Sequence, residues 1–326
     1  MKKIATRAVM RTVYEAVKAR RKVRGPLRPS WSAEFETLAF VLHNYAKRSI
    51  HLPLAWQRAA LTAGVRRTNV VKSMRFEKVS AGGVPSEWFI PPGDSPSDRA
   101  LIYLHGGGYS VGSIDSHRDL VSRLSIASGV RALVPDYRLA PEHKFPAQLT
   151  DARAAYRWLL DSGIAPKKIV IAGESAGGGL TLSTLVETRD KGEPLPAAAV
   201  LLSPWLDLEA ESASMKENAP FDYVSHKVLR AYATRFVREE QMRHPLAAPI
   251  HANLEGLPPL LVQAGEAETL VDDSTRIATL AREAGVDVTL DIEADMIHAW
   301  HVLAPRFPDA QRAIDRIGAF VRRQLS

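Results

Sequence analysis

Cysteine is absent from the sequence, and its absence removes several kinds of chemistry at once. A chain without thiols can form no disulfide, cannot hold a metal through thiolates and cannot use a cysteine as nucleophile. The sequence also lacks any run of about 18 consecutive apolar residues, so no membrane-spanning helix is expected. The basic opening lacks the apolar core of a signal peptide because Arg7 and Arg11 interrupt it, and we therefore expect a cytoplasmic protein.

Acidic residues are scarce only at the start of the chain. Residues 1–72 hold 16 Lys and Arg against 3 Asp and Glu, although the whole chain has a net charge of only +7, so the remainder is net acidic. The excess of cations predicts a weak contact with an anionic membrane surface, with a solvated pair of amphipathic helices as the simpler interpretation. No interleaved aromatic residues accompany the cations, so nucleic acid is not an expected partner.

The order of apolar segments predicts an α/β fold. The 326 residues are 46% hydrophobic and 24% charged, as in a globular protein with a sizeable core. Residues 1–73 read as helical, with Ser32 as a helix cap. From residue 74 onward β-branched runs alternate with helical stretches, which is typical of a mostly parallel sheet covered on both faces. The predicted strands are residues 76–79, 86–90, 101–104, 131–135, 168–172, 198–202, 260–263 and 286–292.

The helical stretches lie mostly between the later strands, and one region departs from the alternation. The predicted helices are residues 117–127, 146–161, 176–189, 271–284 and 309–323. Residues 209–249 contain a helical piece near residues 225–239 but no strand pattern. This stretch is therefore predicted to be an insertion between two strands of the sheet.

Residues 173–177 read Gly-Glu-Ser-Ala-Gly, the pattern of a nucleophile elbow. They follow an apolar strand pattern and precede a helix-forming run, which is the context that the motif requires. A serine at a sharp strand-to-helix turn needs small neighbours, and the flanking glycines supply them. Ser175 is therefore the predicted nucleophile, and a chemically silent turn of small residues is the alternative.

Residues 105–109 read His-Gly-Gly-Gly-Tyr and follow another predicted strand. Consecutive glycines leave backbone N–H groups free to stabilise an oxyanion. A phosphate-binding loop is the alternative, but the Gly-Lys-Ser/Thr sequence and the GxGxxG spacing of such loops are absent. His105 is expected to brace the loop rather than to react.

A serine nucleophile needs a base, which follows the last strand in proteins with a nucleophile elbow. His298 has this position, and His301 is the alternative, with a surface or packing role as its expected one. We expect no metal at this pair because no carboxylate motif accompanies it.

The base needs a carboxylate that holds its tautomer and stabilises the imidazolium. Glu266, Glu268, Asp272 and Asp273 all follow the predicted strand at residues 260–263. Glu268 is favoured because it precedes the helix, whereas the two aspartates fall at the helix start, where acids commonly interact with the helix dipole.

Taken in order, these motifs resemble the bacterial hormone-sensitive-lipase-like branch of the α/β-hydrolases. The likeness spans about residues 75–325 and includes the glycine loop, residues 136–147, the elbow and residues 203–207. It implies an α/β-hydrolase fold with a mostly parallel eight-stranded sheet and a helical cap built from residues 1–73 and about 209–249. Glu174 and Glu268 depart from the pattern, because aspartate is usual at both positions.

The resemblance also implies roles for individual residues. Ser175, His298 and Glu268 would form the triad, and the backbone N–H groups of Gly107, Gly108 and Ala176 would form the oxyanion hole. Tyr109 and Leu206 are the expected substrate contacts, and Arg138 is expected to pair with Asp151.

The implied activity is hydrolysis of small-molecule esters with short to medium acyl chains, without metal or cofactor, by a homodimer. An amidase or peptidase with the same triad is one alternative. The other is a non-catalytic ligand-binding protein on the same fold.

Overall fold

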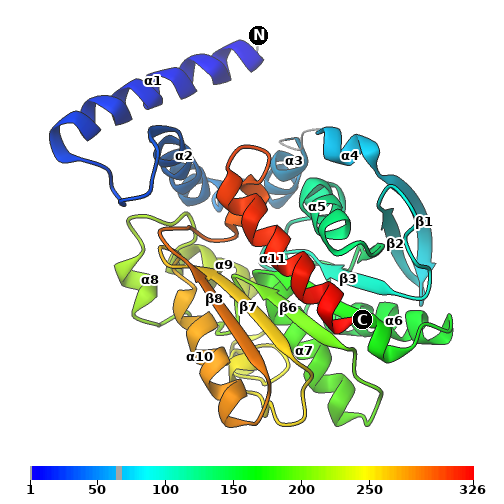
Figure 1. The fold of residues 1–326 in the computed structure, drawn as a ribbon. Helices are drawn as coiled ribbons and strands as arrows, with labels where there is room; N and C mark the ends of the chain where they lie inside the picture. The colour runs from blue at the N-terminus through cyan, green and yellow to red at the C-terminus, as the bar shows by residue number, and fades with distance from the viewer. Residues whose placement is uncertain (1, 64–67) are drawn as a thin grey trace.

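The computed structural model describes residues 2–63 and 68–326, but only the backbone of residues 2–9 and 63. Residue 1 and residues 64–67 of the predicted N-terminal helical segment lie outside the described residues. One eight-stranded sheet runs through the molecule in the order β1-β2-β4-β3-β5-β6-β7-β8 (Figure 1). Its strands are β1 (Arg75–Ala81), β2 (Val84–Ile90), β3 (Ala100–Leu104), β4 (Ala132–Pro135), β5 (Ile169–Glu174), β6 (Ala198–Leu202), β7 (Leu260–Gly265) and β8 (Val288–Glu293).

The sheet is mixed at its start and parallel from there on. Strands β1 and β2 form an antiparallel hairpin, and β2 also pairs antiparallel with β4. From β4 to β8 all neighbouring strands run parallel. The mostly parallel eight-stranded sheet predicted for the chain is thereby confirmed.

Alternating residues of the central strands point to opposite faces, and helices cover both faces. On one face Leu101 and Val170 pack with residues of α5 (Arg118–Ser128) and α11 (Pro308–Gln324). On the other face Ile102 and Ile171 pack with residues of α6, α7 and α10. These three helices are α6 (Ala147–Asp161), α7 (Ala176–Asp190) and α10 (Val271–Glu283). Because both faces are covered, the central strands β3 to β7 are buried throughout and almost entirely apolar.

Among the residues that the structure describes, four helices precede the sheet. They are α1 (Lys2–Arg24), α2 (Ala33–Ser49), α3 (Leu54–Ala63) and α4 (Asn69–Ser73). The predicted cap of the second helix is confirmed, since Ser32 Oγ accepts the N–H of Phe35 at 3.1 Å. Helix α1 extends away from the sheet (Figure 1), and Arg20 and Arg21 tie its end to the buried Glu36. None of the described helices combines the length and apolar character that crossing a bilayer requires.

Residues 203–259, all of which the structure describes, contain no strand. They hold α8 (Ser214–Glu217) and α9 (His226–Phe236) between β6 and β7. Helix α9 is shorter than the helix predicted over residues 225–239. Ser225 caps it from outside, and the buried Val237 has extended backbone angles that end the helix.

Candidate functional site

Ser175 occupies a sharp turn between β5 and α7. Its backbone angles are φ 56° and ψ −122°, a conformation that side-chain-bearing residues rarely adopt. Its N–H donates to Leu202 O at 2.8 Å, and its carbonyl accepts the N–H of Trp205 at 2.9 Å. Hydrogen bonds from the neighbouring strand region therefore hold the turn in this strained conformation.

The glycine loop follows β3 and faces the same space as Ser175. Gly107 and Gly108 have φ values of 109° and 58°, and both line one cavity with Ser175. The carbonyl of Gly107 accepts the N–H groups of Ser110 and Val111, which turns the loop. Within the described residues, the N–H groups of Gly107, Gly108 and Ala176 donate to no protein acceptor. These three predicted oxyanion-hole donors therefore remain available to a ligand.

Buried histidine and tyrosine rings pack beside the glycine loop. His105 is fully buried, stacks on Tyr137 with ring centroids 4.3 Å apart, and places Nδ1 2.8 Å from Gly106 O. Tyr137 donates to the carbonyl of His105 at 2.6 Å. Burial lowers the pKa of His105 to about 3, so this ring is neutral. The predicted bracing role of His105 agrees with these contacts.

Glu174 forms a buried ion pair that sequence reasoning missed. One of its oxygens lies 2.9 Å from His117 Nε2 and accepts the N–H of Gly106 and the hydroxyl of Tyr103, each at 3.2 Å. Burial opposes the charged carboxylate, but His117 and the hydrogen bonds outweigh it and lower the pKa of Glu174 to about 2. His117 opens the predicted helix at residues 117–127 and carries no motif that would single it out.

His298 follows β8 and lines the same cavity as Ser175. Burial lowers its pKa, against the opposing effect of the Asp222 and Glu174 carboxylates, so the neutral form that a base requires is favoured. Its Nδ1 lies 4.0 Å from Glu268 Oε1, and among the described residues neither atom has a hydrogen-bond partner. This distance exceeds a hydrogen bond, and such contacts often shorten when substrate binds.

Glu268 is fully buried and held firmly at its other oxygen. Glu268 Oε2 accepts the hydroxyl of Ser203 at 2.6 Å and the N–H of Gly265 at 2.9 Å. Burial raises the pKa of Glu268, and these two donors favour its ionised form. Its free oxygen is the one that faces His298.

The competing acids and the second histidine make other contacts. Asp272 accepts the N–H of Ser214, and Asp273 accepts the N–H groups of Leu206 and Asp207. Glu266 is 56% exposed and accepts the N–H of Asp295. His301 is buried with Nε2 3.0 Å from Gln263 Oε1, as expected for packing. Of the four predicted candidates, only Glu268 is paired with His298.

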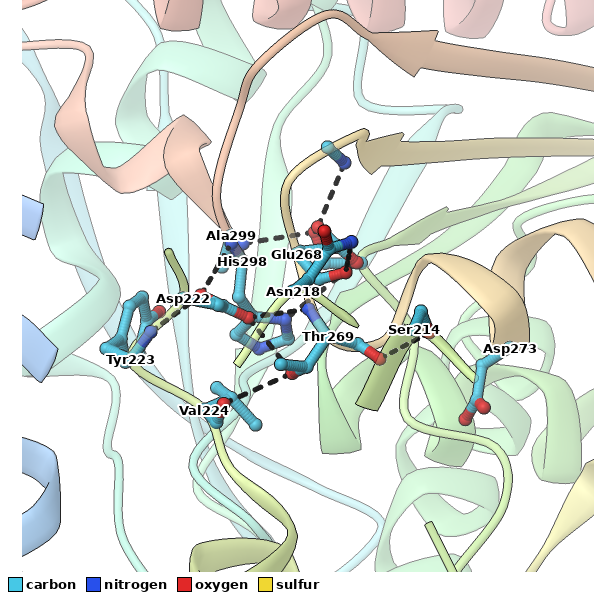
Figure 2. A network of polar contacts seen from close by, with 12 residues as sticks. Ser214, Asn218, Asp222, Tyr223, Val224, Glu268, Thr269, Asp273, His298 and Ala299 are labelled. Carbon is cyan, nitrogen blue, oxygen red and sulfur yellow. Dashed lines mark hydrogen bonds and ion pairs between the residues drawn. The ribbon is translucent and has the colours of Figure 1, made fainter. Parts of the chain in front are cut away.

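A further buried carboxylate, Asp222, lies beside His298 and is absent from the predicted acids (Figure 2). It comes from the insertion between β6 and β7, where the sequence carries no chemical motif. Its only signal is an acid placed between Phe221 and Tyr223 in a mainly apolar stretch.

The cavity beside Ser175 has a volume of about 330 Å³, near the lower end of ligand pockets. Its walls come from the N-terminal helices, the insertion and the loop that carries His298. Besides the residues already placed there, it is lined by Leu42, Tyr45, Ala46, Ser49, Gln57, Leu61, Val111, Ser116, His117, Glu174, Tyr223, Val224, Val228, Leu229, Tyr232, Ile297, Ala299, Val302 and Leu303.

The two predicted substrate contacts are not part of this lining. Tyr109 has a φ of 57° directly after the glycine loop, and its buried ring stacks on Phe236 with centroids 3.7 Å apart. Leu206 is fully buried in the hydrophobic core. Both side chains are taken up by packing, which corrects the expectation that they reach the cavity. The predicted ion pair of Arg138 with Asp151 is present at 2.7 Å.

Comparison with known proteins relates this arrangement to named relatives. Residues 101–302 match a family model described as alpha/beta hydrolase fold. The chain is 44% identical over 245 residues to an acetyl-hydrolase of Streptomyces hygroscopicus. The aligned residues cover 75% of this chain and 81% of the relative.

Solved structures agree with this relationship. An esterase from the bacterial hormone-sensitive lipase family is 41% identical with a TM-score of 0.83, over 88% of this chain and 98% of that one. EstE5, in crystals soaked with p-nitrophenyl butyrate, is 42% identical with a TM-score of 0.84, over 88% of this chain and 97% of that one. Fold, sequence and relatives agree, and the chain thus belongs to the bacterial hormone-sensitive lipase family of α/β-hydrolases and is a carboxylic ester hydrolase.

Proposed function

We propose that the protein is a serine carboxylesterase for short- to medium-chain acyl esters that works through Ser175, His298 and Glu268. One observation carries the proposal: Ser175, His298 and the glycine loop line a single cavity. The free carboxylate oxygen of Glu268 stands behind His298, where it can stabilise a positive imidazolium.

In the proposed reaction, His298 accepts the proton of the Ser175 hydroxyl while Oγ attacks the ester carbonyl. The N–H groups of Gly107, Gly108 and Ala176 stabilise the oxyanion that forms. His298 then gives its proton to the leaving alkoxide, and an acyl-enzyme remains. Water repeats the sequence, releasing the carboxylic acid and the free serine.

The N-terminal helices and the insertion are proposed to act as a cap that limits the acyl chain. Tyr232 of α9 donates to Gln57 Oε1 of α3 at 3.3 Å, so the two segments meet across the site. Most of the wall between them is apolar, as a hydrocarbon chain requires. The cavity volume of about 330 Å³ favours short and medium chains over long ones.

The chain-length preference can be measured with p-nitrophenyl esters from acetate to palmitate. We expect the highest kcat/KM between acetate and hexanoate and a steep fall toward palmitate, because a long chain exceeds the enclosed space. The soak of EstE5 with p-nitrophenyl butyrate supports this range as the place to start. Leu229→Ala should extend activity toward longer chains, whereas Leu280→Ala on the exposed face of α10 should not.

Equal or higher turnover of palmitate would contradict the proposed chain length. The same series includes a p-nitroanilide of the preferred acid. If the anilide matches the ester in kcat/KM, the amidase alternative replaces the esterase.

Covalent trapping tests the nucleophile directly. A serine displaces fluoride from phenylmethylsulfonyl fluoride and becomes a sulfonyl ester, with the hydroxyl proton passing to His298. We expect one sulfonyl group per chain, mapped by peptide mass spectrometry to Ser175, and much slower labelling of His298→Ala. Labelling of Ser49 or Ser116 instead, which also line the cavity, would contradict the assignment.

A further inference from the structure

Asp222 is buried at the junction of the insertion with two loops of the site (Figure 2). Its Oδ1 accepts the N–H of Tyr223 at 2.8 Å and the N–H of His298 at 3.2 Å. Its Oδ2 accepts the N–H and the hydroxyl of Thr269 at 2.9 and 3.0 Å. One carboxylate therefore joins the insertion, the loop of the base and the residue that follows Glu268.

The contacts around Asp222 favour an ionised carboxylate. Its two oxygens accept three backbone N–H groups, and they lie beside the hydroxyl of Thr269, which is also 3.2 Å from Val224 O. Burial raises the pKa of Asp222, while the charge of His298 and the hydrogen bonds from the N–H groups of Thr269 and His298 and from the Thr269 hydroxyl act in the opposite direction. The side chain is thus committed to accepting hydrogen bonds from its neighbours.

A second contact holds the adjacent peptide group. Ser203 Oγ accepts the N–H of Ala299 at 3.0 Å and donates to Glu268 Oε2 at 2.6 Å. Successive N–H groups of the base loop, at residues 298 and 299, are therefore fixed by groups that also bind residues 269 and 268. These two sets of hydrogen bonds hold the loop that carries His298 against the segment that carries Glu268.

We propose that Asp222 is a positioning residue, which orients His298 toward Ser175 and Glu268. The position of the base then depends on correct packing of the insertion. The inference rests on the proposed role of His298 as base. Asp222 bonds the backbone of His298 rather than its ring, so it acts through the position of the loop and through its charge.

The charge of Asp222 adds an effect that a purely structural residue would not have. The titratable groups that face His298 are Asp222, Glu174 and Glu268, together with Tyr223 and His301. The carboxylates of Asp222 and Glu174 raise the pKa of His298 against the effect of burial. Removing the charge of Asp222 would therefore lower the pKa of His298, and the acid limb of the pH profile would move to lower pH.

The test compares Asp222→Asn with the wild type, using kcat and KM for p-nitrophenyl butyrate from pH 4 to 9. Active sites are counted by sulfonyl labelling, so that unfolded protein does not enter kcat. We expect kcat per labelled site to fall about tenfold to a hundredfold, because small misplacements of catalytic groups have effects of this size. KM should change little, and the acid limb should shift to lower pH.

Three further variants separate positioning from stability. Thr269→Val keeps the carboxylate and removes one donor, so kcat should fall modestly with no shift of the acid limb. Asp222→Glu keeps the charge and should retain the wild-type acid limb. Asp273→Asn removes a buried acid that binds the backbone of residues 206 and 207, and it should lower stability without moving the limb.

Unchanged kcat per site and an unchanged acid limb in Asp222→Asn would overturn the inference. If that variant does not fold, full kcat in both Thr269→Val and Asp222→Glu would overturn it as well. Failure of the triad proposal is distinguishable, since Ser175→Ala and His298→Ala would then retain activity whatever Asp222 does.

Discussion

Replacing Ser175 by alanine should lower kcat/KM for p-nitrophenyl butyrate by about a thousandfold or more. The variant loses the only atom that bonds to the acyl group in the proposed reaction. The oxyanion donors are backbone groups and stay in place, so weak residual catalysis by water is expected. His298→Ala should cause a loss of similar size, and the double variant should be little worse than either, because the two side chains act as one unit.

A buried serine of the helix that follows Ser175 serves as the matched control. Ser183 lies in α7 and donates to Gly179 O at 3.0 Å, outside the cavity. Ser183→Ala should keep the activity of the wild type per folded molecule. Ester turnover by purified Ser175→Ala within tenfold of the wild type would refute the assignment of the nucleophile.

Replacing Gly177 by alanine is the change with the largest expected effect on stability. A Cβ at this position would lie 2.0 Å from Leu104 O and 2.6 Å from His105 O. Both are backbone atoms of β3 and the glycine loop, so neither can move aside cheaply. We expect the free energy of unfolding to fall by roughly 3 kcal/mol or more, beyond the usual cost of overpacking.

Urea denaturation followed by tryptophan fluorescence measures the change. Gly192→Ala is the control, because it adds the same methyl group in open space at a φ of 66°. It should lower the free energy of unfolding by only about 1 kcal/mol, from backbone strain. Equal stability of the two variants would show that the close approach of α7 to β3 is not what the glycine provides.

The sequence predicts most of the sheet because the central strands are short apolar runs that alternate with helical stretches. Ser175 and the glycine loop are also predictable, since each belongs to one short segment whose spacing carries the chemistry. Glu268 could be favoured only by its place after the strand, and the structure adds the contacts that separate it from Asp272 and Asp273.

The residues that the sequence does not predict act through contacts between distant segments. His117 meets Glu174 from the start of α5, and Asp222 meets His298 from the insertion. No spacing links these partners, because their meeting depends on the complete fold. Tyr109 illustrates the opposite case: it follows the glycine loop in sequence, yet its buried ring packs on Phe236.

The homodimer and the weak membrane contact of residues 1–72 stay predictions. Among the described residues of this segment, Trp56 and Phe40 are 68% and 52% exposed. Neither side chain lines the cavity. A second copy of the chain or a membrane that contacts these two side chains would therefore not need to touch the reacting groups.

The origin of the cavity walls has a consequence for how such enzymes diverge. The wall side chains lie largely on α2, α3 and α9, whereas the reacting groups lie on loops at the ends of strands. Substitutions on the wall helices can thus accumulate in a lineage and alter which esters are accepted, while the bond-breaking groups are inherited unchanged. Tyr232 packs directly against the glycine loop, since a Cβ at Gly108 would lie only 2.5 Å from its ring. Exchange of these helices between relatives should therefore transfer acyl preference most cleanly where this tyrosine is kept.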